Sequence, residues 1–281
     1  MVVGIASIPP QIRGHVKIEV MANNKRVDQV LVERGLVNNL EEAKRFIMAG
    51  KVRHLGQVIM KASQKINNED EITLIQNSKF VSRGGEKLGA AFTQFPLIVS
   101  DRVCADVGAS TGGFTDCLLI NGASRVYAVD VGYGILNWRL RNDPRVVVME
   151  RTNARFLVAL PEPVEFITAD VSFISLKKIL PVISNWFPPG GGEAVVLIKP
   201  QFEATREESA RGVGVIIDPE IHQRILTEIL SSACEQGYQI NGLIRSPLVG
   251  PEGNTEFLAW LSFPGDQSSK EPIQAYISSL F

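Results

Sequence analysis

A glycine-rich turn between an apolar strand and a helix is the feature that most constrains this sequence. Residues 104–114 read Cys-Ala-Asp-Val-Gly-Ala-Ser-Thr-Gly-Gly-Phe, and a second acid, Asp130, ends the next apolar run. Glycine lets a backbone approach a ligand closely, and an acid at the end of the second strand of a βαβ unit lies where ribose hydroxyls bind. The sequence therefore predicts a nucleotide-binding βαβ unit.

The spacing within this turn separates two classes of cofactor. A dinucleotide-binding turn has the form GxGxxG, whereas this one is Asp-x-Gly-x-x-x-Gly-Gly from Asp106 to Gly113. An acid entering the turn suits the positively charged amino-acid end of S-adenosylmethionine better than a pyrophosphate. We therefore expect S-adenosyl-L-methionine as the cofactor and regard a nicotinamide-dependent dehydrogenase as the weaker alternative.

Strands alternate with helices from about residue 81, which predicts an α/β fold, Rossmann-like, with a mostly parallel sheet covered on both faces. The candidate strands are 102–106, 125–130, 146–149, 166–169, 194–198, 242–245 and 256–261. The candidate helices are 111–121, 138–141, 176–186 and 219–237. We expect four parts in the chain: an N-terminal extension at 1–25, a small domain at 26–80, the sheet domain at 81–265 and a tail at 266–281.

The small domain has a different pattern, with two helices at 26–35 and 40–49 followed by short strands at 51–53, 57–59 and 71–75. Residues 1–87 carry 14 Lys and Arg against 9 Asp and Glu, whereas the remainder carries 15 against 21. The excess of basic residues in this N-terminal part predicts that it binds a polyanion through phosphate contacts. The alternative is an unevenly charged surface, since a single basic residue is more often only solvated.

The composition indicates a globular protein, because 45% of the 281 residues are apolar and 21% are charged. The longest uncharged run, 179–192, contains prolines and glycines and cannot form a spanning helix. Cys104, Cys117 and Cys234 have neither paired nor zinc-type spacing, so we expect buried free thiols in a reducing cytoplasm. The three histidines are scattered, so no metal site is expected. Residues 1–20 are expected to be a loose extension or an over-long start.

Four charged residues fall where such a sheet carries its active site. Lys87 precedes the sheet, Asp170 and Lys199 directly follow apolar strands, and Glu256 opens the last one. Charged groups that extend apolar strands are partly desolvated, so each is costly unless it is paired or used. Any one of them could belong to a structural ion pair, but all four beside a cofactor turn favour catalysis.

Together these motifs resemble a known family. The set Ser82-Arg83-x-x-x-Lys87, Asp106 to Phe114, Asp170, Lys199-Pro200 and Glu256 is similar to the Lys-Asp-Lys-Glu tetrad of FtsJ-type ribose 2′-O-methyltransferases. The run 43–52 in the small domain is similar to an S4-type RNA-binding domain. With the further motifs at 129–134, 150–153, 170–175 and 199–203, the chain resembles the TlyA (haemolysin A) family of ribosomal RNA methyltransferases from residue 26 to about 263.

The resemblance implies methyl transfer from S-adenosylmethionine to a ribose 2′-hydroxyl of ribosomal RNA, with cytidine as the target. It implies that Lys199 helps to deprotonate the hydroxyl. It also implies that Lys87, Asp170 and Glu256 hold the lysine and the hydroxyl in line with the sulfonium methyl group. A hydroxyl is a poor nucleophile until a base or a cation stabilises its oxyanion. Whether Lys199 is the base or an electrostatic stabiliser stays open, and Glu252 is a rival for the role of Glu256.

The turn is expected to surround the methionine end of the cofactor, Asp130 to bind its ribose and Asn153 to approach its adenine, although an asparagine in a loop is often only a turn former. The expected cofactor-binding residues are Asp106, Gly108, Ala109, Ser110, Thr111, Gly112, Gly113, Phe114, Asp130, Val131 and Asn153. The expected RNA-binding residues are Arg26, Lys44, Arg45, Lys51, Arg53 and Arg83.

The chain departs from the family pattern at Ala204-Thr205, where a glycine is usual, and at Val213, where two glycines usually adjoin. These departures concern a substrate-facing loop. Two other functions stay as alternatives: an RNA-binding or ribosome-assembly protein on a methyltransferase scaffold, and membrane lysis, which no amphipathic segment supports. We expect a cytoplasmic protein whose partner is ribosomal RNA or a ribosomal subunit. The sequence predicts neither the oligomeric state nor which cytidine of which ribosomal subunit is modified.

Overall fold

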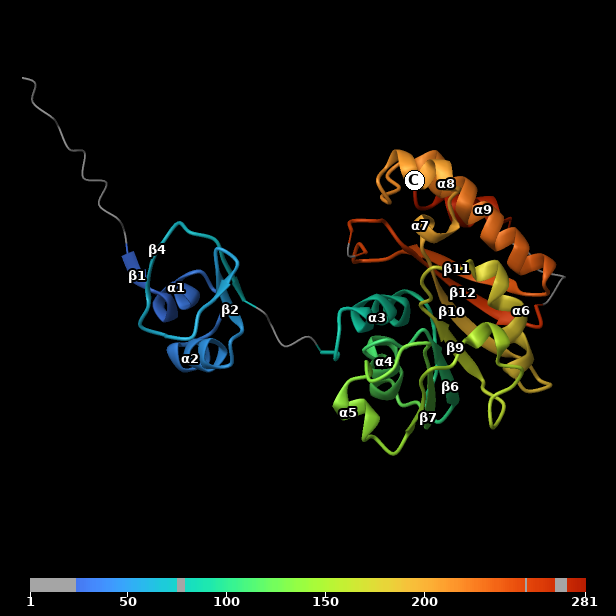
Figure 1. Ribbon diagram of the computed structural model, residues 1–281, viewed down its shortest axis with the longest axis horizontal. Helices are drawn as coiled ribbons and strands as arrows, with labels where there is room; N and C mark the ends of the chain where they lie inside the picture. The colour runs from blue at the N-terminus through green and yellow to red at the C-terminus, as the bar shows by residue number, and fades with distance from the viewer. Residues whose placement is uncertain (1–23, 75–78, 251, 266–271) are drawn as a thin grey trace, which may run out of the picture. The chain divides into compact units, whose positions relative to one another are not determined.

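The computed structural model describes residues 24–74, 79–250, 252–265 and 272–281 (Figure 1). The chain divides into two units, Met1–Gln76 and Asn77–Phe281, close to the expected boundary after residue 80. Each unit is described by itself. The expectation of a loose extension or an over-long start concerns residues 1–20, which lie outside the described residues.

The first unit packs two helices against short strands. Helix α1 (Val27–Glu33) and helix α2 (Leu40–Met48) are followed by β2 (Val52–His54), β3 (Gln57–Val58) and β5 (Ile72–Leu74), which form an antiparallel sheet in the order β3-β2-β5. The Asn39 side chain accepts the Glu42 N–H and so caps α2. The sequence analysis missed β1 (Asn24–Arg26) and β4 (Lys65–Asn67), a short antiparallel pair of largely polar residues. Such a pair has little hydrophobic alternation by which to recognise it.

The second unit contains a seven-stranded sheet in the order β11-β12-β10-β9-β6-β7-β8. Its strands are β6 (Val103–Val107), β7 (Arg125–Val129), β8 (Val146–Met149), β9 (Phe166–Ala169), β10 (Gly192–Ile198), β11 (Gln239–Arg245) and β12 (Phe257–Phe263). All neighbouring strands from β10 to β8 are parallel, and β12 runs antiparallel between β10 and β11. The expected α/β, mostly parallel architecture is confirmed.

Helices cover both faces of this sheet (Figure 1). One core joins the sheet to α3 (Gly84–Gln94), α4 (Gly113–Ile120) and α5 (Trp138–Arg141). The other core joins it to η1 (Ala154–Phe156), η2 (Leu176–Lys178), α6 (Leu180–Ile183), η3 (Ser184–Trp186), α9 (Pro219–Glu235) and α10 (Ile273–Ser278). The short helices α7 (Pro200–Glu203) and α8 (Arg206–Arg211) follow β10. Cys104 and Cys117 are buried thiols, and burial raises the pKa of both to about 12, whereas Cys234 is only partly buried, contrary to expectation.

Helix α3 was not expected, because Gly84, Gly85 and Gly89 weaken a helical pattern. The packing explains Gly85: a Cβ there would lie 2.2 Å from the ring of Phe80. Helix α3 lies against α4 and β12, and it carries Lys87, whose side chain is nearly buried. The missed helix therefore brings the first residue of the expected tetrad to the sheet.

Two further expectations need correction. The expected helix 176–186 is divided into η2, α6 and η3, because Pro181 lacks the N–H that a continuous helix would use. The expected tail at 266–281 is not separate in its described part, since α10 packs on α9 and β11. Ile277 is fully buried, and the Tyr276 hydroxyl donates to the Ile240 carbonyl at 3.1 Å.

Candidate active site

The glycine-rich turn lies at the carboxyl end of β6, directly beside the end of β9. Gly108 has a φ of +82°, and a Cβ at this position would lie 2.4 Å from the carbonyl oxygen of Asp170. Only glycine avoids both the strain and the clash. The Asp170 N–H also donates to the Val107 carbonyl at 2.9 Å. The turn and the expected catalytic acid are therefore held against each other by backbone.

Asp106 lies beneath the turn and not in its cavity. Its carboxylate is fully buried: Oδ2 accepts the Thr115 N–H at 2.8 Å and the Thr115 hydroxyl at 2.6 Å, and Oδ1 lies 3.1 Å from the Thr168 hydroxyl. Burial, with a smaller contribution from the Asp170 charge, raises the pKa of Asp106 to about 7 in spite of the bonds from Thr115 and Thr168. The geometry gives Asp106 the task of shaping the turn.

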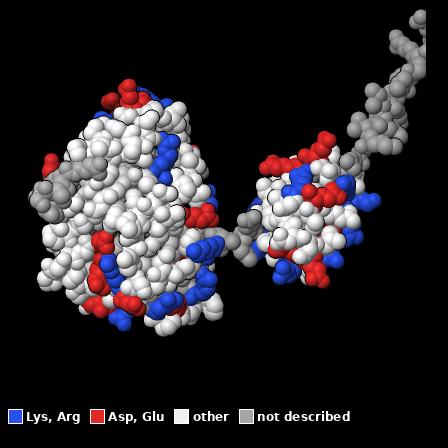
Figure 2. Space-filling model, turned by 180° about the vertical axis from the view of Figure 1, so that it is seen from behind, with Lys and Arg blue, Asp and Glu red and all other residues white. Residues whose placement is uncertain are grey.

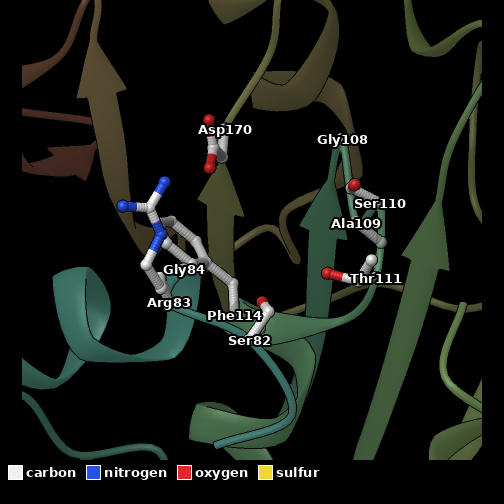
Figure 3. A pocket seen from close by; sticks show the side chains of 10 residues that line it. Ser82, Arg83, Gly84, Gly108, Ala109, Ser110, Thr111, Phe114 and Asp170 are labelled. Atoms are coloured by element: carbon white, nitrogen blue, oxygen red, sulfur yellow. The ribbon is translucent and has the colours of Figure 1, made fainter. Parts of the chain in front are cut away.

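Two adjoining cavities flank the turn, with volumes of about 230 and 280 Å³. Both are lined by Gly108, Ser110 and Asp170, so they form one groove of the size that cofactor sites have. Figure 3 shows Gly108 and Asp170 at the ends of neighbouring strands, with Arg83 reaching into the same cavity from the start of α3. The first cavity is further lined by Ser82, Gly84, Ala109, Thr111, Gly113 and Phe114.

The second cavity has the donors and acceptors that an adenosine needs. Both oxygens of Asp130 accept backbone N–H groups, from Ser110 and Gly132, each at 2.7 Å. A carboxylate has about four acceptor positions, so two remain for ribose hydroxyls. Asn153 lines this cavity, and its Oδ1 accepts the Arg155 N–H at 3.1 Å. It is thus a turn former and still has its side-chain amide N–H groups to offer a base.

The residues present therefore fit S-adenosylmethionine, because the turn lines both cavities and Asp130 lines the second one. Val131 also lines the second cavity. Gly112 lines neither of these two cavities; a Cβ there would lie 2.2 Å from the Leu140 side chain, so this glycine serves helix packing.

The four expected tetrad residues form two ion pairs. Lys199 Nζ lies 2.5 Å from Asp170 Oδ1, but without the direction of a hydrogen bond. Lys87 Nζ donates to Glu256 Oε2. In the sheet, Ile198 pairs with Phe257, and Val196 pairs with Ala169. Lys199 follows Ile198, Asp170 follows Ala169 and Glu256 precedes Phe257. These three residues therefore lie at the same edge of the sheet.

Glu256 and its rival Glu252 differ in surroundings. Glu256 is 1% exposed and holds the Lys87 ammonium, whereas Glu252 is exposed. A Cβ on Gly250 would lie 2.8 Å from Glu256 Oε1, so the preceding loop also closes over this carboxylate. The geometry favours Glu256 as the partner of Lys87.

Several groove residues were not singled out from the sequence. Gly84 belongs to the unexpected α3, whereas Ser82, Ser172 and Phe173 lie in motifs that the resemblance had already marked without giving these residues a role. Phe173 is 90% exposed, has a φ of +62°, and its ring centroid lies 4.8 Å from that of Phe202. The motif marked this loop in the sequence, but it did not show which of the loop's side chains face the site.

The expected RNA-binding residues of the first unit differ in how free their charges are. Lys44 and Arg45 are exposed on α2, and Arg53 is exposed with one N–H donated to the Gly56 carbonyl at 3.0 Å. Arg26 is bound to Asp28 at 2.7 Å, and Lys51 lies 5.8 Å from the ring of Phe46.

Charges of both signs are interspersed over this unit on the face in Figure 2. Residues 24–74 hold nine Lys and Arg against seven Asp and Glu. Much of the positive excess over residues 1–87 therefore lies outside this small fold. The exposed basic residues of the unit, and not its net charge, are therefore the groups that it offers to a polyanion.

No helix in the described parts of the chain is long and apolar enough to cross a membrane. Within the same residues, no three His, Cys, Asp or Glu side chains are grouped so that they could hold a metal ion.

Comparisons with known proteins agree with the geometry. Residues 80–263 match the family described as FtsJ-like methyltransferase. The 16S/23S rRNA (cytidine-2′-O)-methyltransferase TlyA of Mycobacterium tuberculosis is 43% identical, over 88% of this chain and 93% of that protein. Hemolysin A of Brachyspira hyodysenteriae is 41% identical, over 83% and 98%. A solved structure from Streptococcus thermophilus is 40% identical, with a TM-score of 0.68 over 92% of this chain and 96% of that one. The chain belongs to the FtsJ-like methyltransferases and, within them, to the TlyA family.

Proposed function

We propose that this protein transfers a methyl group from S-adenosylmethionine to the ribose 2′-hydroxyl of a cytidine in ribosomal RNA. The observation that carries the proposal is the meeting of two lysine–carboxylate pairs, Lys199–Asp170 and Lys87–Glu256, at the edge of the sheet where the cofactor groove opens. The cytidine and the ribosomal RNA follow from the family relationship, since the TlyA relative bears both in its name.

The chain's own residues divide the work of this reaction. Gly108 to Phe114 and Asp130 hold the cofactor, which supplies an electrophilic methyl group when bound. Lys199 contacts the 2′-hydroxyl and lowers the cost of its oxyanion. As a neutral amine it takes the hydroxyl proton, and as an ammonium it stabilises the oxyanion by its charge while the proton passes to solvent. Asp170 holds the Lys199 ammonium, and the Lys87–Glu256 pair supports the same edge from α3 and β12.

The first unit supports an RNA substrate through exposed basic groups at Lys44, Arg45 and Arg53. Its two-helix and short-strand order is similar to an S4-type domain, and we infer that it contacts RNA phosphates. A ribosomal substrate would be met in the cytoplasm, where ribosomes assemble.

The test is methyl transfer to separate 30S and 50S subunits taken from cells that lack the modification. Purified protein and radiolabelled S-adenosylmethionine should produce 2′-O-methylcytidine, identified by mass spectrometry of nuclease digests. Lys199→Ala should abolish transfer while the affinity for the cofactor stays within a few-fold of wild type. The control is Lys178→Ala, which changes an exposed lysine of the same unit and should leave transfer unchanged.

Two outcomes would contradict the proposal. Retained turnover in Lys199→Ala would remove Lys199 from the chemistry. RNA binding without cofactor binding or transfer by the wild-type protein would favour an RNA-binding or assembly factor on a methyltransferase scaffold.

A further inference from the structure

The hydrogen bond from the Lys199 ammonium to Ser172 is a feature that the four-residue set does not include. Lys199 Nζ donates to Ser172 Oγ at 3.0 Å. The contact with Asp170 is an ion pair without hydrogen-bond direction. Among the described residues, Ser172 is therefore the group that gives the ammonium a directed bond.

We propose that Ser172 is a positioning residue that directs Lys199 Nζ toward the acceptor hydroxyl, an inference that rests on the proposed function. An ammonium nitrogen has three N–H directions on a flexible four-carbon stem. A nearby charge restricts where the nitrogen lies, but it restricts the rotation of these directions only weakly. Ser172 accepts one of these directions, and Asp170 holds the charge without taking another, so two directions remain and the substrate hydroxyl can use one of them.

The loop that carries Ser172 is held by contacts of the residues that directly follow it. Phe173, directly after it, adopts a left-handed conformation that is costly for a large side chain. Its ring packs against that of Phe202, and Lys199 Nζ lies 5.7 Å from the Phe202 centroid. Three residues further, the Leu176 N–H donates to Glu203 Oε1 at 2.8 Å. The segment after Lys199 thus fixes the loop that in turn orients Lys199.

Ser172 also borders the cofactor groove. Ser172 lines the second cavity together with Asp130 and Asn153. A hydroxyl located between the catalytic lysine and the cofactor groove orients the lysine without adding another charge to a site that already contains Asp170. An ionic partner at this position would compete with the developing oxyanion for Lys199.

The experiment compares Ser172→Ala with Ser172→Thr, which keeps the hydroxyl. Steady-state methyl transfer to the ribosomal subunit that the wild-type protein modifies gives kcat and the KM for RNA, and calorimetry gives the Kd for S-adenosylmethionine. Ser172→Ala should lower kcat about 10- to 100-fold, as expected for a misdirected group, with both binding constants within about three-fold of wild type. Ser172→Thr should recover most of kcat. The matched control is Ser231→Ala, a half-buried serine of α9 that lines neither cavity of the groove, which should behave as wild type.

An unchanged kcat in Ser172→Ala, an equal loss in Ser172→Thr, or a loss that appears only in cofactor affinity would overturn the inference. A crystal structure of Ser172→Ala gives a readout that needs no turnover: the Lys199 ammonium should lose its single position, and an unmoved Lys199 would also contradict the proposal. If the wild-type protein transfers no methyl group to either subunit, the proposed function fails, and the crystal structure still tests the role of Ser172.

Discussion

Lys87 and Glu256 are 169 positions apart in the sequence and form an ion pair that is almost completely buried. The pair joins α3 to the start of β12, so the same contact fixes part of the tertiary structure and presents charge at the candidate site. A buried pair of this kind is costly to form and costlier to break, because removing one partner leaves the other charge buried alone.

The two roles of this pair can be separated by substitution. Lys87→Met should destabilise the second unit by about 3–5 kcal/mol, whereas Lys87→Met combined with Glu256→Leu should recover most of that loss. Methyl transfer should be lost in both variants, because restored packing does not restore charge. Urea unfolding and turnover measure the two effects. A double variant that regains activity would assign the pair a purely structural role.

The ribose-binding role of Asp130 predicts a selective loss of cofactor affinity. Asp130→Ala should weaken S-adenosylmethionine binding by about 1–3 kcal/mol, because ribose hydroxyls lose their acceptor. Calorimetry measures the effect, and a melting curve checks that the turn bound by Asp130 stays folded. Asp143→Ala, which removes a carboxylate paired with Arg145, is the matched control. Equal affinities in the two variants would place the ribose acid elsewhere.

The buried carboxyl of Asp106 predicts how stability depends on pH. Its pKa is about 7 in the folded state against an ordinary 3.8, so the folded protein binds this proton more tightly than the unfolded chain does. The contribution of this protonated carboxyl to the free energy of unfolding is therefore greatest below pH 4 and is lost as the pH rises from about 4 to 7. Asp106→Asn keeps an acceptor for Thr115 and removes the titration. The melting temperature of the variant relative to wild type should rise between pH 5 and pH 8, and a constant difference would contradict this assignment.

The exposed basic residues of the first unit predict a change in salt dependence. Replacing Lys44, Arg45 and Arg53 with Gln should weaken RNA binding and reduce the slope of log K against log salt by about 2–3 units, since each lost phosphate contact removes roughly 0.7–0.9. Turnover at saturating RNA should be unchanged. Replacing Lys25, Lys61 and Lys65 removes the same charge and should change the slope less. Equal slopes in the two triple variants would show that net charge, and not these positions, governs binding.

Local pattern was enough to predict the strands that carry the site. The strands ending near Asp106, Asp130 and Asp170 are short runs of buried apolar residues, and each lies within one or two residues of its expected bounds. The glycine-rich turn after β6 was recognisable for the same reason, because its backbone conformation restricts which residues can occupy it. A single sequence displays such local properties: the hydrophobic periodicity of strands, the residue types of turns and the position of acids at strand ends.

The pairing of charges needed the tertiary structure. Sequence alone placed Lys87, Asp170, Lys199 and Glu256 near one sheet edge, but it could not show that Lys87 pairs with Glu256 or that Lys199 bonds to Ser172. Helix α3 was hidden by its glycines, and only the packing of Phe80 against Gly85 explains why one of them is there. Likewise, the sequence predicts Asp106 as a cofactor ligand. Only the structure shows that its carboxylate is buried and bonded to Thr115 and Thr168, where it supports the turn. Contacts between distant residues depend on how helices and strands pack, and that packing is a property of the whole chain that no local window contains.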